Sequence, residues 1–317
     1  MSRPRFGVLM DSIEQIKPWK DTSFALLLAA QERGWRCEYI RPEDIYFSAG
    51  QVRAQIRSVQ VTDQHEDFYS CGTAEDIALT ELDILIQRQD PPIDLNYHYI
   101  TALLALAEQS GLLVANKPDA LRASNEKLLA QQYPQFCPPT LVSRHLADFE
   151  RFLCEQNTLV VKPLDAMGGA GIFKLSAEDP NSRGILELLT ESEQQLIMAQ
   201  RFLPEIAQGD KRVLLVDGKP VSHGLLRTPG AGSIRANLAA GGSGNVTQLT
   251  EREYQIANSV GPELAERGFW FVGLDIIGGW LTEINVTSPT CAREIHAACG
   301  IDAAGLLLDT LWNKCRN

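Results

Sequence analysis

A lysine that precedes a glycine-rich stretch is the first group of residues suited to chemistry. Lys162 ends the apolar run LVVK, and Gly168, Gly169 and Gly171 follow shortly after it. A lysine leaving a strand and the backbone N–H groups of a flexible loop can both face phosphate oxygens. An ordinary hairpin loop after an edge strand is the alternative. The P-loop pattern, in which the lysine follows the glycines, and a complete G-x-G-x-x-G are both absent from the sequence.

A second candidate site lies in the segment DIIGGWLTEIN. Glu283 and Asn285 are two positions apart on a predicted strand, so their side chains share one face, and Asp275 lies on the preceding arm of the hairpin. Two carboxylates and an amide suit Mg²⁺ that bridges phosphates. A strict two-residue turn at Gly278 and Gly279 would put Asp275 on the opposite face from Glu283. Convergence therefore requires a three-residue turn or a glycine bulge at Gly278–Trp280; a solvated polar face is the alternative.

Three arginines near glycine-rich chain form a third candidate group: Arg212, Arg227 and Arg235. Residues 230–244 include five glycines and several alanines, which predicts a mobile lid rather than a packed segment. Arginines at the root of such a loop and within it suit an anion clamp that forms on closure. An ordinary disordered loop is the alternative.

Other reactive residue types form no recognisable site. Ser243 in GGSGN resembles a nucleophile elbow, but Asn245 replaces the last glycine and no strand–turn–helix pattern surrounds it. The five histidines lack the spacing of metal ligands, which argues against zinc. Cys291 follows the acidic hairpin, and we expect a buried, unreactive thiol there.

The composition limits the partners and the compartment. A net charge of −11 repels nucleic acid and anionic membranes. The apolar runs are too short to cross a bilayer, and the N-terminal one is too short for a signal peptide. Seven scattered cysteines without a C-x-x-C pair indicate a reducing compartment, so we expect a cytoplasmic protein.

Residues 1–122 alternate between short apolar runs and helical periodicity. Strands are predicted at 5–10, 36–40, 83–88 and 112–116, and helices at 22–34 and 97–110. This alternation predicts a parallel α/β sheet covered by helices. The insertion EDIYFSAGQVRAQIRSVQV instead predicts a hairpin that turns near Ala49 and Gly50.

From residue 123 onward the pattern predicts an antiparallel α+β unit. A helix at 125–133 precedes the strands LVVKP, IFKLS and LIMAQRFL, and further hairpins turn at Asp217–Gly218 and Gly278–Gly279. We therefore predict an N-terminal substrate-side domain, 1–122, and a second domain, 123–317. The second domain would have a central lobe at about 125–200 and a C-terminal lobe at about 201–317, with the lid at 228–244.

A lysine before glycines, a lid arginine and Asp…Glu-x-Asn on a hairpin, in that order, resemble the ATP-grasp fold, in which ATP lies between two α+β lobes. The chain also resembles the bacterial glutathione synthetase family from end to end. The segments that carry this resemblance are GVLMD, DTSFALLLAAQERG, NKPDALRASNEKL, KPLDAMGGAGIF, MAQRFLP, GDKRVLLVDG, NLAAGG and FVGLDIIGGWLTEINVTSPTC. D-alanine:D-alanine ligases would share the nucleotide residues but not NVTSPT or NLAAGG.

The resemblance implies a role for each candidate residue. The ATP phosphates would be held by Lys127, Lys162, Gly168, Gly169, Ala170 and Gly171. The adenine side would be formed by Gln200, Arg201, Phe202 and Leu203, with Asp210 near the ribose. Mg²⁺, or Mn²⁺ in its place, would be bound by Asp275, Glu283 and Asn285. The γ-phosphate and the substrate carboxylates would be gathered by the catalytic arginines Arg212, Arg227 and Arg235, and the dipeptide pocket would be shaped by Arg88, Ser288 and Thr290.

The implied reaction joins γ-glutamylcysteine and glycine at the expense of ATP, through an acyl phosphate, and the family is typically homotetrameric. The alternatives are another ATP-grasp carboxylate–amine ligase and a nucleotide-binding module without turnover. One departure lies in the lid. The family usually has an acidic residue before the lid arginine and a glycine after it, whereas Ser233 and Ile234 precede Arg235 here and Ala236 follows it.

Overall fold

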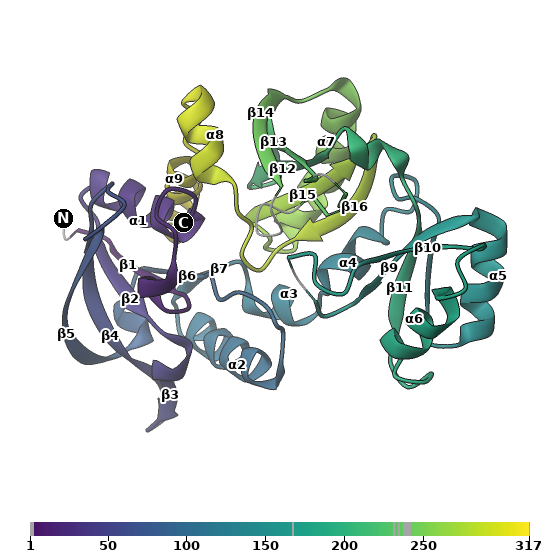
Figure 1. Ribbon diagram of the computed structural model, residues 1–317. Helices are drawn as coiled ribbons and strands as arrows, with labels where there is room; N and C mark the ends of the chain where they lie inside the picture. Colours follow the sequence, from purple (N-terminus) through teal and green to yellow (C-terminus); the bar gives the residue numbers. More distant parts are fainter. Residues whose placement is uncertain (1–2, 167, 231, 234, 237–241, 317) are drawn as a thin grey trace.

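The computed structural model describes residues 3–166, 168–230, 232–233, 235–236 and 242–316. Three sheets follow one another along the chain, and Figure 1 shows them as three units, with the C-terminal sheet between the N-terminal and central ones. None of the helices within these ranges is long and apolar enough to cross a membrane.

The first sheet has a parallel core, as predicted. The strands β1 (Arg5–Leu9), β2 (Arg36–Ile40), β6 (Ile84–Gln87) and β7 (Leu113–Ala115) pair in the order β2-β1-β6-β7, all parallel. The helices between them are α1 (Thr22–Glu32) and α2 (Leu95–Gln109), each capped by an aspartate side chain at its N-terminus. The carboxyl ends of β1 and β6 lead into Asp11 and Arg88, so these residues lie at one edge of the sheet.

The insertion extends this sheet in an antiparallel manner. The strands β3 (Ile45–Ser48) and β4 (Gln51–Val61) form the predicted hairpin around Ala49 and Gly50. A further strand, β5 (Tyr69–Ala78), pairs with β4 and was not predicted. Its first residues are mostly exposed and polar, so the strand lacks the apolar alternation by which a half-buried strand is recognised.

The central sheet is antiparallel and carries the lysine–glycine segment. It contains β8 (Thr140–Ser143), β9 (Thr158–Pro163), β10 (Phe173–Ser176) and β11 (Ile197–Arg201), in the order β10-β9-β11-β8. The helices α5 (Leu146–Gln156) and α6 (Ser182–Leu189) pack on it through one apolar cluster. The short helices α3 (Pro118–Arg122) and α4 (Glu126–Ala130) precede it. The helix predicted at 125–133 thus begins as expected but ends at Ala130. Pro134 disfavours a helical conformation at the residue before it, Tyr133, so the helix ends earlier than predicted.

The C-terminal sheet is also antiparallel and positions the arginines and acids. It contains β12 (Asp210–Val216), β13 (Lys219–Thr228), β14 (Ser243–Gln248), β15 (Phe271–Ile277) and β16 (Trp280–Asn285), in the order β14-β13-β12-β15-β16. Its turns at Asp217–Gly218 and Gly278–Gly279 are those predicted. The helix α7 (Glu251–Glu266) begins with a capping box between Thr250 and Glu253 and packs on the sheet.

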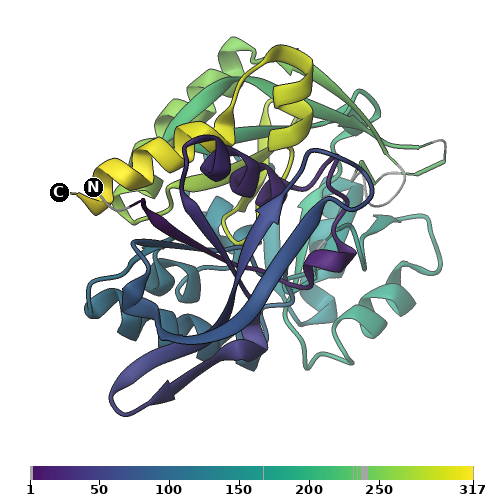
Figure 2. The same cartoon turned by 90° about the vertical axis from the view of Figure 1, so that its left-hand side faces the viewer.

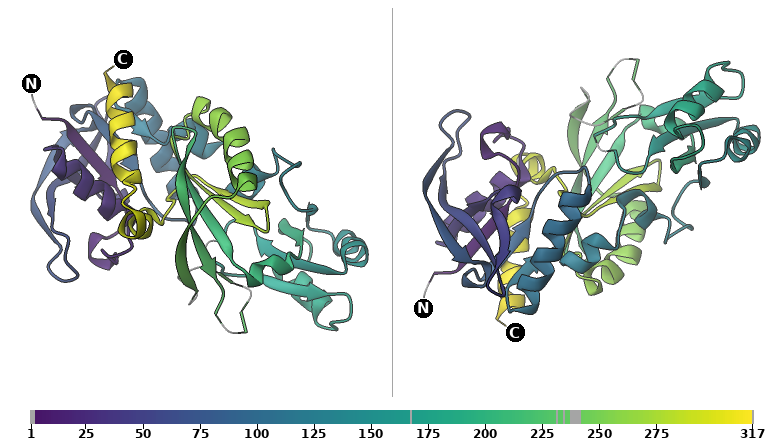
Figure 3. Two further views of the ribbon diagram at one scale, coloured as in Figure 1. Left: turned by 90° about the horizontal axis from the view of Figure 1, so that it is seen from above. Right: turned by 90° about the horizontal axis from the view of Figure 1, so that it is seen from below.

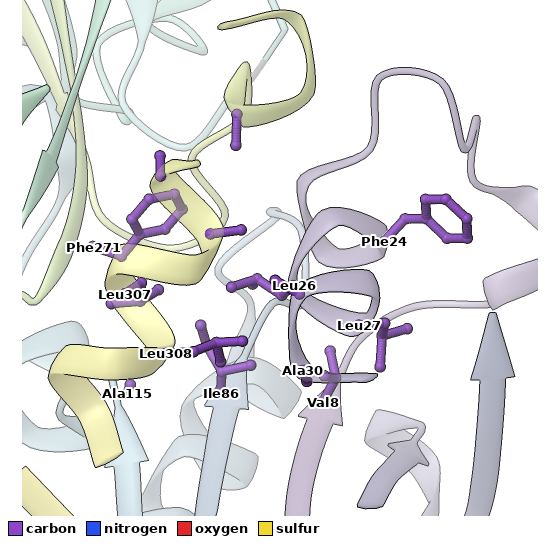
Figure 4. Close-up of a cluster of buried hydrophobic side chains, with 14 of the residues drawn as sticks. Val8, Phe24, Leu26, Leu27, Ala30, Ile86, Ala115, Phe271, Leu307 and Leu308 are labelled. Carbon is purple, nitrogen blue, oxygen red and sulfur yellow. The ribbon is translucent and has the colours of Figure 1, made fainter. Parts of the chain in front are cut away.

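The last two helices, α8 (Ala292–Cys299) and α9 (Ala303–Cys315), return to the first sheet (Figures 2 and 3). In α9, Leu307 and Leu308 are fully buried against Leu26 of α1 and Ile86 of β6 (Figure 4). The end of the chain therefore covers the N-terminal domain in space, although in sequence it follows the second domain.

Candidate functional site

A cavity of about 580 Å³ lies where the three units meet. It is lined by most of the predicted site residues: Lys127, Lys162, Gly168, Gly169, Ala170, Gln200, Arg201, Phe202, Leu203, Asp210, Arg212, Arg227, Arg235, Asp275, Glu283, Asn285, Ser288 and Thr290. Two predicted residues, Arg88 and Gly171, lie outside its lining within the described part of the chain. The structure therefore brings together residues that are up to 163 positions apart in the sequence, from Lys127 to Thr290.

The two lysines face the C-terminal sheet from the other side of the cavity. Lys162 lies on β9 and is only 7% exposed, and its Nζ atom is 3.5 Å from the carbonyl oxygen of Thr282. Lys127, on α4, donates to the carbonyl oxygen of Ala166 at 2.6 Å and lies 3.2 Å from Glu283 Oε1. Burial lowers the pKa of Lys162 more than the nearby carboxylates raise it. An anionic ligand in the cavity would favour the charged form of this lysine.

The acidic hairpin contains the bulge that convergence requires. The turn at Gly278 and Gly279 has two residues, yet Asp275 pairs directly with Glu283, so Thr282 is the extra residue of a bulge. The Thr282 hydroxyl donates to the carbonyl oxygen of Asp275 at 3.1 Å. The predicted pairing of Asp275 with Glu283 on one face is therefore found, but the prediction of a glycine bulge or three-residue turn at Gly278–Trp280 is wrong, because the extra residue lies within β16.

The oxygen atoms of this hairpin suit a hard cation. Within the described ranges, no group of three His, Cys, Asp or Glu side chains is placed to hold a metal ion. The candidate set instead combines the carboxylates of Asp275 and Glu283 with the amide of Asn285, whose Nδ2 donates to the Gly273 carbonyl at 3.2 Å. Because the amide nitrogen makes that hydrogen bond, the amide oxygen remains available as a ligand for a metal ion. Carboxylate, amide and phosphate oxygens together match the preference of Mg²⁺, which seldom relies on protein ligands alone.

Asp275 also belongs to a network of four buried charges. Arg212 donates to both carboxylate oxygens of Asp275, at 2.5 and 3.0 Å. Arg227 Nη2 lies 2.5 Å from Asp210 Oδ2 and 2.9 Å from Asp275 Oδ1. Burial raises the pKa of Asp275, but the two guanidinium groups outweigh it and hold that pKa below its usual range. Burial raises the pKa of Asp210 to about 6 against the opposing effect of Arg227.

The apolar end of the cavity lies at the strand β11 and the residues after it. Gln200 donates to the Thr140 hydroxyl at 3.1 Å, which fixes the side chain at the end of this strand. The apolar lining residues include Pro138, Val160, Ile172, Phe202, Leu203, Ile206 and Ile277, and Val160 pairs with Gln200 in the sheet. A slot of this kind suits a flat aromatic base, whereas the charged end suits phosphates.

The predicted lid is described only in part. Arg235 and Ala236 line the cavity, and the Arg235 backbone N–H donates to the Ser233 hydroxyl at 3.0 Å. Residues 231, 234 and 237–241 of the predicted lid lie outside the described residues, and with them Ile234 and most of NLAAGG.

Arg88 lies behind the cavity wall. Its guanidinium donates to the Ser23 hydroxyl at 3.1 Å and to the Pro289 carbonyl at 3.0 Å, and it is 3% exposed. Ser288 and Thr290, on either side of Pro289, do line the cavity. Arg88 therefore supports the segment that carries them.

Several lining residues were missed by sequence reasoning. The N-terminal domain contributes Asp11, Lys17, Lys20 and Asp21 around the short 3₁₀ helix Ile13–Gln15, and α4 contributes Glu126. Asp11 could have been found, because it lies two residues after the end of a strand of a parallel sheet, where ligands commonly bind. Burial raises the pKa of Glu126, and the neighbouring Glu283 adds to this rise. Cys291 also lines the cavity; it is buried and its pKa is raised by burial, as an unreactive thiol requires.

The fold is that of ATP-grasp ligases. The solved structure of the ATP-grasp ligase PsnB, complexed with a phosphomimetic variant of its minimal precursor, Mg and ADP, superposes with a TM-score of 0.63. The comparison covers 99% of this chain and 99% of that chain at 17% sequence identity.

Sequence comparisons define the family within this class. The family model for the N-terminal domain of prokaryotic glutathione synthetase matches residues 5–122, and the model for its ATP-grasp domain matches residues 126–300. The glutathione synthetase of Pseudomonas syringae pv. tomato is 49% identical over 98% of this chain and 97% of its own length. That of Photorhabdus laumondii subsp. laumondii is 48% identical over 98% of both. The chain belongs to the prokaryotic glutathione synthetase family.

Proposed function

We propose that this chain joins γ-glutamylcysteine to glycine at the expense of ATP, whose γ-phosphoryl group is transferred to the dipeptide, giving glutathione, ADP and phosphate. The observation that carries the proposal is the cavity itself: two lysines on one side face two carboxylates and paired arginines on the other, in a chain whose full length matches glutathione synthetases. ATP would lie with its base in the apolar end and its phosphates between Lys127, Lys162 and the loop that contains Gly168 and Gly169.

The first chemical step would transfer the γ-phosphoryl group of ATP to the cysteinyl carboxylate. The bond to the ADP oxygen breaks and a bond to a carboxylate oxygen forms, giving an acyl phosphate. Arg212, Arg227 and Arg235 would bind the negative charge of the two reacting groups, which repel each other without such partners. Asp275, Glu283 and Asn285 would hold Mg²⁺ or Mn²⁺, which when bound offsets phosphate charge.

In the second step the glycine amine would attack the acyl carbon. A C–N bond forms, the C–O bond to phosphate breaks, and the proton lost by the amine passes to the departing phosphate or to solvent. Water would compete with glycine at this point, so the residues around Arg235 would serve to exclude it.

The setting of the reaction is also a proposal. We propose a cytoplasmic enzyme that acts on small molecules, without nucleic acid or membrane partners, and that assembles as a homotetramer. Sedimentation equilibrium of the purified chain would test the assembly, and a monomer would contradict it.

The function is tested by phosphate release and product mass, with γ-glutamylcysteine as donor and each amino acid in turn as acceptor. Glycine should give ADP, phosphate and glutathione in equal amounts. Turnover with D-alanine alone would favour the D-alanine:D-alanine ligase alternative. ATP binding without turnover under any acceptor would favour the non-catalytic module.

A further inference from the structure

The segment between β16 and α8, residues 286–291, is irregular but buried at the cavity. Thr287, Ser288 and Thr290 line the cavity, while Val286 and Thr287 are only 1% and 6% exposed. Backbone groups buried outside helices and sheets need partners from elsewhere in the chain. We call residues 286–291 the substrate turn.

Glu126 makes more hydrogen bonds to this turn than the other side chains that hold it. Its Oε1 atom accepts from Val286 N at 2.7 Å, from Thr287 N at 2.9 Å and from the Thr287 hydroxyl at 2.9 Å. Three other side chains hold the turn with one hydrogen bond each: Asn116 to the Val286 carbonyl at 2.8 Å, Arg88 to the Pro289 carbonyl at 3.0 Å, and Arg212 to the Thr290 hydroxyl at 3.5 Å. Of these four anchors, Glu126 and Arg212 line the cavity within the described ranges, and of these two only Glu126 binds the backbone of the turn.

The residues beside Glu126 reach the phosphate side of the same cavity. Asn125 caps α4 and donates through Nδ2 to the Leu164 carbonyl at 2.9 Å. Lys127 donates to the Ala166 carbonyl at 2.6 Å and lies 3.2 Å from Glu283. Three consecutive residues therefore join the approach to the glycine loop, the acidic strand β16 and the substrate turn.

We propose that Glu126 is a positioning residue for the second substrate. Its carboxylate fixes the substrate turn, so that Thr287, Ser288 and Thr290 present their polar groups to γ-glutamylcysteine at a set distance from the phosphates held by Lys127. A single oxygen that accepts three donors is best supplied by an ionised carboxylate, because charge strengthens each hydrogen bond. The inference rests on the proposed function, and it assigns Glu126 to the dipeptide rather than to ATP.

The test uses the variants Glu126→Ala and Glu126→Gln in the full chain. Glu126→Ala should lower kcat/KM for γ-glutamylcysteine about 100-fold, because the turn loses three hydrogen bonds. Glu126→Gln keeps an oxygen acceptor and should raise the KM for the dipeptide only about 3–10-fold. The affinity for a non-hydrolysable ATP analogue, measured by calorimetry without dipeptide, should stay within about threefold in both variants.

Glu253→Ala is the matched control. Glu253 is also a glutamate in the first turn of a helix, accepts from Thr250 N at 2.7 Å and pairs with Lys211 at 2.9 Å, but it lies outside the cavity lining. It should lower the melting temperature without changing the KM for the dipeptide.

Three outcomes would overturn the proposal. The first is a folded Glu126→Ala variant with kcat/KM within threefold of the unmodified chain. The second is a parallel loss of nucleotide and dipeptide affinity in the Glu126 variants. The third is the combination of a Glu126→Ala variant that does not fold and a Glu126→Gln variant that is normal in every measurement. In that case Glu126 would serve folding alone. An unmodified chain that makes no glutathione would instead refute the proposed function.

Discussion

Replacing Arg212 by methionine tests the buried charge network most directly. Arg212 and Asp275 are 5% and 4% exposed, and their two hydrogen bonds form a bidentate pair at 2.5 and 3.0 Å. Methionine has similar length but no charge, so the variant leaves Asp275 with Arg227 as its remaining cationic partner at 2.9 Å.

The expected loss of stability follows from the cost of removing one partner of a buried ion pair. Such a change usually costs about 3–5 kcal/mol, because a buried charge is left without its partner. Arg227 still compensates part of the charge of Asp275, so we expect the free energy of unfolding to fall by about 2–3 kcal/mol at neutral pH. Activity should fall about 10²–10³-fold, the scale for removal of one preorganised charge donor.

The loss of stability should depend on pH in a defined direction. In the unmodified chain the pKa of Asp275 is held below its usual range, so the ionised form contributes stability above the ordinary pKa of a carboxyl and loses it as the pH falls. Without Arg212, burial should outweigh Arg227 and raise that pKa. The variant then loses stability as the pH rises through the raised pKa. The pKa of Asp210, which Arg212 also lowers, should shift in the same direction.

The assay is urea denaturation of the unmodified chain and of the Arg212→Met variant at pH 5, 6, 7 and 8, with unfolding monitored by tryptophan fluorescence. The difference in unfolding free energy should be larger at pH 8 than at pH 5. Lys211→Met is the control, since Lys211 is the neighbouring residue on β12 and pairs with Glu253 away from the cavity. It should lose stability but keep kcat/KM within about threefold. A pH-independent difference, or equal loss of activity in both variants, would refute the reasoning.

Three further results are expected. Glu283→Gln should require more Mg²⁺ for half-maximal turnover while the melting temperature changes little, and a Mg²⁺ titration identical to that of the unmodified chain would contradict the metal assignment. Arg235→Ala should leave the affinity for an ATP analogue nearly intact, lower kcat about 10²–10³-fold and raise the ratio of phosphate released to tripeptide formed; a ratio of one at normal rate would show that Arg235 does not guard the intermediate. In the native chain iodoacetamide should modify the exposed Cys154 and Cys299 before the buried Cys291, as read by peptide mass spectrometry, and early loss of Cys291 would contradict its burial.

Local patterns in the sequence were sufficient for most of the elements and many of the site residues. The parallel strands of the first sheet are short buried runs, and their helices have aspartate caps, so both leave a signal within a few neighbouring residues. Residue type and short spacing also pointed to the lysine before glycines and to the acids of the hairpin, which the structure brings together around the cavity. The polar strand β5 was missed because its exposed residues carry no such pattern.

Long-range contacts decided the rest. The sequence allowed Asp275 and Glu283 to lie on the same or on opposite faces, and only the bulge at Thr282 resolved the two cases. Arg88 was predicted to shape a dipeptide pocket; in the structure its guanidinium does not line the cavity, because Ser23 and Pro289, 65 and 201 positions away, bind it.

The sequence by itself therefore determined which residue types could hold phosphates, metal and carboxylates, and the family to which their order belongs. The tertiary structure alone decided that α9 packs on the first sheet and that Glu126 binds a turn 160 positions away. The physical reason is that burial and hydrogen bonding between distant segments depend on how the sheets pack, and a local pattern of residues carries no record of that packing.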